Sequence, residues 1–159
     1  MGSLDLPVIF FIEGFALADH RDPEDLRLAI KLLTLAIRSK MDAPGDPLAY
    51  QVIAYAGRAS AYYAIGDFSK SVADSRKLVA MIPPDRHLLQ DSYKLLTISL
   101  LRSGDYQSAL AAAMEYMTRI GDPEARRWLD LVEFYPQNPQ FALNELLKIY
   151  FAPVAKSGG

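Results

Sequence analysis

A helix-start signal recurs along the 159-residue chain and constrains its fold more than any other feature. In this signal a capping side chain stands directly before a proline, at Asp22-Pro23, Asp46-Pro47, Asp122-Pro123 and Asn138-Pro139. The Asp or Asn oxygen accepts hydrogen bonds from the unpaired N–H groups of the first turn, which stabilises a helix by about 1 kcal/mol. Proline fits the first helical position because its missing N–H would have no partner within the helix.

Further starts follow glycine or proline. Gly66 and Gly104 each precede an aspartate, so the glycine can end one helix in a left-handed conformation while the aspartate caps the next. The signals together predict eight helices, which start at Asp5, Asp22, Asp46, Asp67, Asp85, Asp105, Asp122 and Asn138.

Apolar residues between these starts recur every three to four positions, as in Leu26, Ile30, Leu33 and Ile37. No segment alternates with period two for long enough to predict a sheet, so the expected fold class is all-α. Alternate starts, at residues 5, 46, 85 and 122, lie 41, 39 and 37 residues apart, a period typical of stacked helical hairpins. We expect one domain over residues 1–159, with about four antiparallel helix pairs at approximately 5–41, 46–83, 85–120 and 122–151.

Residues 52–120 carry a family resemblance. The segment from Ala59 to Phe68 has a small residue, an aromatic residue and a Gly-Asp-aromatic turn at the spacing of a tetratricopeptide (TPR) repeat. A second such turn, Gly104-Asp105-Tyr106, follows 38 residues later, whereas the family repeat is 34. Leu78 and Tyr116 depart from the family pattern, which usually has alanine there. The resemblance implies a right-handed superhelical stack, in which the first helix of each pair lines a concave groove.

Aligning the turns assigns residues to that groove. The partner-binding residues implied by the resemblance are Phe11, Phe15, Ile53, Tyr63, Lys94, Ile98, Arg102, Arg127, Trp128 and Leu131. TPR co-chaperones that bind chaperone C-termini use a carboxylate clamp, and this chain keeps none of its residues. The matching positions hold Phe11, Phe15, Gly57, Asp91 and Leu95. We therefore expect the groove to bind an amphipathic helix or an apolar peptide rather than an acidic chain terminus.

Several other functions have no support in the sequence. The formal net charge is −2 and there is no basic run, so we expect no nucleic-acid binding. The chain has no cysteine, and its two histidines, His20 and His87, have no metal-ligand spacing. No nucleophile, phosphate-binding or dinucleotide motif occurs. We therefore expect a non-catalytic protein with no cofactor and no metal.

The apolar run at residues 8–18 allows two interpretations. It ends in Ala16-Leu17-Ala18, as a signal peptide could, but it contains Glu13 and no basic residue precedes it. The run is also shorter than the roughly 20 apolar residues that span a bilayer. We expect a buried helix, no membrane insertion and a cytoplasmic location. Its second apolar face could meet a second copy, which gives a homodimer, or a partner chain, or the rest of a longer protein.

The leading functional hypothesis is an adaptor or scaffold that binds another protein through the groove. One alternative is a client-specific chaperone of the type III secretion TPR class, and another is a self-associating structural subunit. The sequence does not identify the partner.

Overall fold

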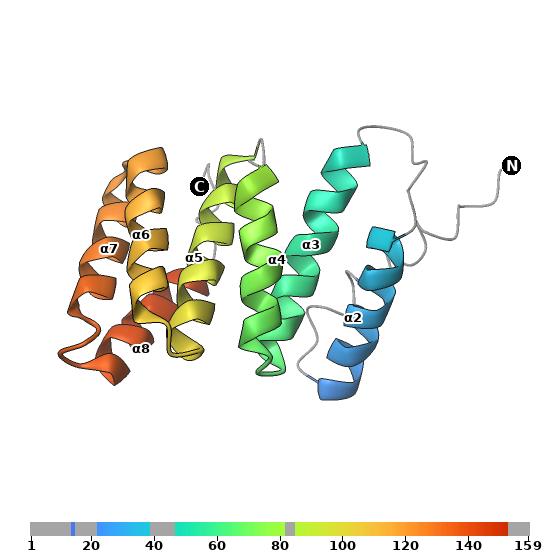
Figure 1. The fold of residues 1–159 in the computed structure, drawn as a ribbon, viewed down its shortest axis with the longest axis horizontal. Coiled ribbons are helices and arrows are strands. Elements are labelled where there is room, and N and C mark those ends of the chain that lie inside the picture. The colour runs from blue at the N-terminus through green and yellow to red at the C-terminus, as the bar shows by residue number, and fades with distance from the viewer. Residues whose placement is uncertain (1–13, 15–21, 39–46, 82–84, 153–159) are drawn as a thin grey trace, which may run out of the picture.

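The computed structural model describes residue 14 and residues 22–38, 47–81 and 85–152 (Figure 1). These ranges form seven α-helices and contain no strand. The helices are α2 (Pro23–Arg38), α3 (Pro47–Ala64), α4 (Phe68–Met81), α5 (Arg86–Arg102), α6 (Tyr106–Ile120), α7 (Pro123–Phe134) and α8 (Pro139–Tyr150). The predicted all-α class is confirmed. The helix starting at Asp5, the residues Phe11 and Phe15, and a dimer through the N-terminal helix concern positions outside the described ranges.

The caps lie where the helix-start signals predict them. Asp85 accepts from the backbone N of His87 at 2.8 Å, and Asp122 accepts from that of Ala125 at 2.8 Å. The side chains of Asp22, Asp67, Asp105 and Asn138 accept in the same way at their own helix starts. Helix α3 also begins at the predicted Pro47. Local capping chemistry therefore sets where each of these helices starts.

Two glycine turns repeat the same geometry. Gly66 and Gly104 have left-handed φ angles of 86° and 84°. The N–H groups of Gly66 and Asp67 bond to the carbonyls of Tyr63 and Tyr62, at 3.0 and 2.9 Å, and the same pair of bonds recurs at Gly104 and Asp105. This pattern of bonds ends a helix with its last carbonyls satisfied. Each turn thus closes one helix and opens the next, which makes α3–α4 and α5–α6 similar hairpins.

The helices pack mainly against their neighbours in sequence, and each one from α2 to α7 contacts the next (Figure 1). Two contacts break this order, because α5 touches α3 and also α8. No contact joins α4 to α6 within the described part of the chain. Helices α3 and α5 therefore form an inner layer, and α4 and α6 lie farther apart in an outer layer. We call the exposed side of α3, α5 and α7 that receives α8 the inner face.

Small side chains allow the helices to approach one another closely. The Ser71 hydroxyl of α4 donates to the carbonyl of Ala59 in α3 at 2.9 Å and lies 3.0 Å from the Ser99 hydroxyl of α5. All three residues are fully buried. Tyr116 is also fully buried and stacks on Tyr93 with ring centroids 5.8 Å apart. One buried cluster therefore runs from α3 to α8.

A buried ion pair joins the first three described helices. Arg58 of α3 makes two 2.7 Å hydrogen bonds to the carboxylate of Asp74 in α4, and a third of 3.1 Å to Thr34 in α2. The two charged side chains are only 16% and 7% exposed. Tyr55 and Tyr62 lie beside the guanidinium, 5.3 and 5.8 Å from it. Because the planar guanidinium matches a carboxylate, this geometry fixes α4 against α3.

We expect Asp74→Ala to destabilise the fold by about 3–5 kcal/mol, because it leaves the Arg58 charge buried without a partner. Urea denaturation followed by circular dichroism measures the loss. The matched control is Lys70→Ala, which removes an exposed pair with Asp67 on the same helix. That change should cost less than about 1 kcal/mol. Equal losses for the two variants would contradict the assignment of Arg58–Asp74 as the pair that joins these helices.

Candidate functional site

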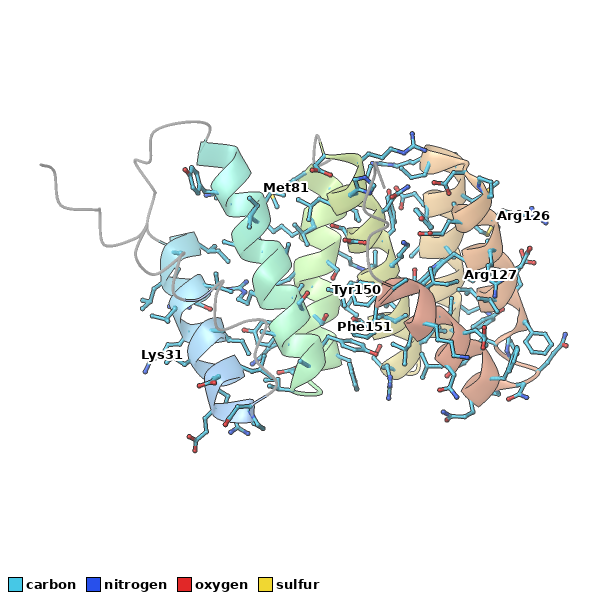
Figure 2. The ribbon with its side chains drawn as sticks, turned by 180° about the vertical axis from the view of Figure 1, so that it is seen from behind. Lys31, Met81, Arg126, Arg127, Tyr150 and Phe151 are labelled. Atoms are coloured by element: carbon cyan, nitrogen blue, oxygen red, sulfur yellow. The ribbon has the colours of Figure 1, made fainter. Side chains whose placement is uncertain are left out.

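Helices α2 to α7 stand side by side in a row, whereas α8 runs across the inner face of that row (Figure 2). It contacts α7, which precedes it, and α5, which lies 37 residues or more before its first residue. Ala142 and Leu146 are fully buried, and Ile149 and Tyr150 pack partly buried against the core cluster. These positions recur at intervals of four, three and one, so they form one apolar side of a helix. The inner face therefore holds an amphipathic helix of the same chain.

The end of α8 reaches α3. Ser60 and Tyr63 of α3 and Asp91 of α5 lie near enough to the Tyr150 hydroxyl to influence its pKa. Burial raises the pKa of Tyr150 to about 12, while the Ser60 side chain opposes that rise and the charge of Asp91 adds to it. In the middle of α8, Glu145 pairs with Arg127 of α7 at 3.6 Å. Helix α8 is thus held by the apolar contacts of Ala142, Leu146 and Ile149, together with an ion pair in its middle.

A pocket of about 520 Å³ lies beside the end of α8, between the first turns of α5 and α7. Its lining comprises Arg86, His87, Gln90, Asp91, Lys94, Asp122, Glu124, Ile149, Tyr150 and Ala152. Most of the charges in it are paired. Lys94 bonds to Glu124, and Gln90 donates to Asp122 at 2.9 Å. Arg86 lies 3.7 Å from the same Asp122 carboxylate.

Two groups that line this pocket, Asp91 and Tyr150, have raised pKa values, and so does Tyr116 in the core nearby. Desolvation raises the pKa of the Asp91 carboxyl, while the neighbouring Lys94 and His87 lower it. Desolvation also raises the pKa of Tyr116, and Asp122 and Glu124 add to the effect. The Tyr116 hydroxyl is buried and has no hydrogen-bond partner among the described residues. A pocket with charges of both signs can hold polar parts of a ligand or of a bound peptide.

The residues predicted to line the groove fall into three environments. Ile98 and Trp128 are fully buried, so no partner can touch them in this structure. Lys94 is 6% exposed and is paired with Glu124. The remaining described positions keep accessible surface: Ile53, Tyr63 and Leu131 are half-buried, and Arg102 and Arg127 are exposed.

Some predicted residues do come together. Arg102 lies over the rings of Tyr63 and Phe68, at 6.0 and 5.7 Å, and these two rings meet edge to face at 5.3 Å. With Ala64 and Gly66 they line a hollow of about 250 Å³. Arg127 lies apart from this group and faces α8 instead.

Two residues important for the inner face were not predicted from the sequence. Tyr150 anchors α8 and Glu124 pairs with Lys94, yet neither was assigned to the groove. The signal that could have indicated Tyr150 is its place on the apolar side of α8. The helix that this apolar side contacts cannot be identified from the residues of α8 alone.

Comparison with protein-family models, curated proteins and solved structures finds no match to this chain. Among the described residues, no group of three His, Asp or Glu side chains is placed to hold a metal ion. No helix in the described ranges has the length and apolarity needed to cross a membrane. The described ranges of the chain are thus all-helical, with seven helices packed in sequence and α8 across the inner face.

We expect the Tyr150→Phe variant to lose less stability in alkali than the wild type. An unfolded tyrosine ionises near pH 10, whereas Tyr150 in the fold ionises near 12. Its contribution to stability is therefore complete below pH 10 and falls as the pH rises from 10 to 12. Urea denaturation at pH 8, 10 and 11 measures this. An identical loss in both proteins would contradict the burial of the Tyr150 hydroxyl against α3.

Proposed function

We propose that this chain is a non-catalytic, TPR-like protein-binding module whose inner face binds an amphipathic helix of another protein. The observation that carries the proposal is α8, which is itself an amphipathic helix seated on that face through Leu146, Ile149 and Tyr150. Recognition of a helix in a groove uses apolar anchors spaced by one or two turns. The apolar side of α8 has that spacing, so it serves as an internal example of a ligand.

The repeated turns support the TPR-like part of the proposal. Hairpins α3–α4 and α5–α6 end their first helices with the same left-handed glycine and the same pair of backbone bonds. Small buried residues follow at matching places, Ser71 in α4 and Ala109 in α6. A stack of such hairpins shares its apolar surfaces between neighbours and leaves one side of the first helices for a ligand.

The inner face also offers a cluster beside the end of α8 that keeps accessible surface. Tyr63, Phe68 and Arg102 lie together at the end of α3 and α5, and they combine aromatic surface with a cation. Aromatic residues and arginine are the usual anchors of protein interfaces. A partner helix could bind beside α8 through these residues, or it could replace α8. Both modes agree with an adaptor or scaffold located in the cytoplasm.

The test supplies α8 as a separate molecule. A fluorescent peptide of residues 138–152 is titrated with the wild-type chain and with the full-length variant Ile149→Asp/Tyr150→Asp, in which α8 cannot seat. We expect the variant to bind the peptide at least tenfold more tightly than the wild type, because its face is vacant. Fluorescence anisotropy gives both affinities, and circular dichroism checks that the variant stays folded.

Two controls make the result specific. The chain variant Phe141→Asp, which changes an exposed residue of α8, should bind the peptide no better than the wild type. A peptide with Phe141→Ser and Phe151→Ser should still bind, whereas one with Ile149→Ser and Tyr150→Ser should not. If a folded Ile149→Asp/Tyr150→Asp chain failed to bind the unaltered peptide, the inner face would not be a helix-binding surface.

A further inference from the structure

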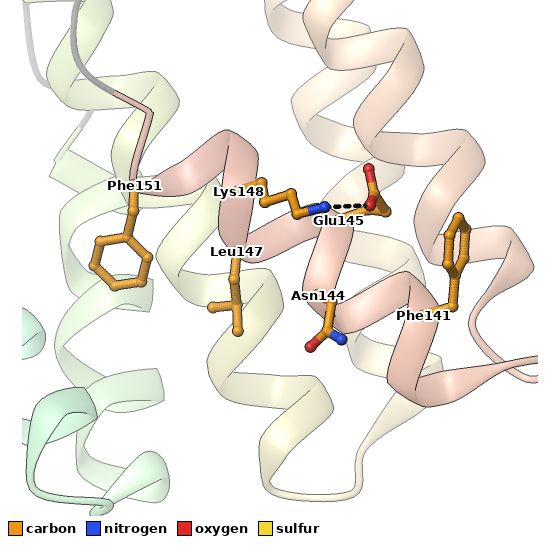
Figure 3. Close-up of a pocket in the computed structure, with 6 residues that line it drawn as sticks. All are labelled: Phe141, Asn144, Glu145, Leu147, Lys148 and Phe151. Atoms are coloured by element: carbon orange, nitrogen blue, oxygen red, sulfur yellow. Dashed lines mark hydrogen bonds and ion pairs between the residues drawn. The ribbon is translucent and has the colours of Figure 1, made fainter.

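A second side of α8 exposes two phenylalanines, one in the first turn of the helix and one directly after its last residue (Figure 3). Phe141 is 49% exposed and Phe151, directly after the helix, is 65% exposed. Leu147 lies between them in the sequence, half-buried and packed against the core cluster. Together with Asn144, Glu145 and Lys148 they line a shallow hollow of about 640 Å³. We call this surface the outer stripe of α8.

Within the described residues, the two phenylalanines of the outer stripe are only partly covered. Apart from Phe134 of α7, which meets Phe141 edge to face at 5.9 Å, no ring contact covers the two phenylalanines from another helix. A helix that is apolar on two sides is normally covered on both. The inner side of α8 is covered by α5, and the outer stripe leaves large apolar side chains in contact with water. Such a patch marks a binding surface.

The order of residues along the stripe indicates what covers it. Phe141, Asn144, Lys148 and Phe151 are spaced by three, four and three positions. The spacing reads the same in both directions about Leu146. When two copies of α8 lie antiparallel across a twofold axis at that residue, Phe141 of each faces Phe151 of the other. The stripe is therefore complementary to itself, as a twofold interface requires.

The charges favour the same arrangement. Lys148 is highly exposed and lies 3.0 Å from Glu145, one turn before it on the helix. In the antiparallel pair, Lys148 of one copy comes next to Asn144 and Glu145 of the other, so opposite charges meet. In a parallel pair, Lys148 would face its own copy, and the like charges would repel. Complementary charges fix the register of an interface more than its affinity.

We propose that the outer stripe of α8 binds the outer stripe of a second copy, antiparallel, in a twofold-symmetric dimer. The inner side of α8 stays on α5 in each copy, so this pairing does not depend on the proposed function. One pair of 12-residue helices buries less than the roughly 1,200–2,000 Å² of a stable interface. The dimer is accordingly weak and reversible, and it dissociates on dilution through the micromolar range.

Sedimentation velocity over a dilution series from 500 to 1 μM measures the association. We expect Phe151→Asp and Phe141→Asp each to raise the dimer dissociation constant at least tenfold. The matched control is Met114→Asp on α6, which places the same charge at a residue of similar exposure, 53%. This control should leave the dissociation constant unchanged. A wild-type chain that stays monomeric at 500 μM would overturn the proposal.

Disulfide formation tests the register. The chain has no cysteine, so introduced thiols are the only ones present. A mixture of Asn144→Cys and Lys148→Cys chains, oxidised at high concentration, should give mainly the mixed disulfide between the two variants. Met114→Cys chains should give none.

Three other outcomes would each overturn the antiparallel α8 pair. Predominant Lys148→Cys homodimers would indicate parallel helices. A dimer insensitive to Phe141→Asp and Phe151→Asp would place the interface elsewhere. A monomer whose cysteine at position 148 is shielded from a thiol reagent would mean that a segment of the same chain covers the outer stripe.

Discussion

When each helix of a stack packs on the next one in sequence, one side of the stack stays uncovered, and here the packing of α8 on α5 covers part of that side. Each helix from α2 to α7 covers part of the next, but the inner face of α3 and α5 has no neighbour in sequence to cover it. Leu146 enters the shared buried cluster from across this face, and the Tyr150 side chain lies near enough to Ser60 in α3 for the two to influence each other. A surface that buries a helix of its own chain has the shape and chemistry to bind a helix of another.

The stack itself depends on short-range devices. The turns at Gly66 and Gly104 set the two central hairpins, because each ends one helix and caps the next. Small residues such as Ala59 and Ser71 then let those helices approach. The Arg58–Asp74 pair adds a directional contact that small apolar residues cannot supply. The inner face is therefore held by a rigid support, and α8 is added to it last in the chain.

The predictable part of the fold is the part determined locally. A cap and the turn it closes depend on residues within four positions of each other, so the starts at Pro23, Pro47 and Pro123 could be predicted. The path of α8 depends on contacts with residues far away in the sequence. The apolar residues of α8 can be read from its sequence, but the helices that they contact cannot. For the same reason Ile98 and Trp128, assigned to a groove, lie in the core. Lys94 and Glu124, 30 residues apart, gave no local sign of pairing.

The seat of α8 on the inner face is the central claim, and nuclear Overhauser effects measure it most directly. In a spectrum of the wild-type chain, this account predicts cross-peaks between the ring protons of Tyr150 and the side-chain protons of Ser60 and Tyr63. It also predicts that the chemical shifts of the Tyr150 ring protons differ from those of an exposed tyrosine. Exposed-type shifts for Tyr150, with no cross-peak to any residue of α3, would contradict it.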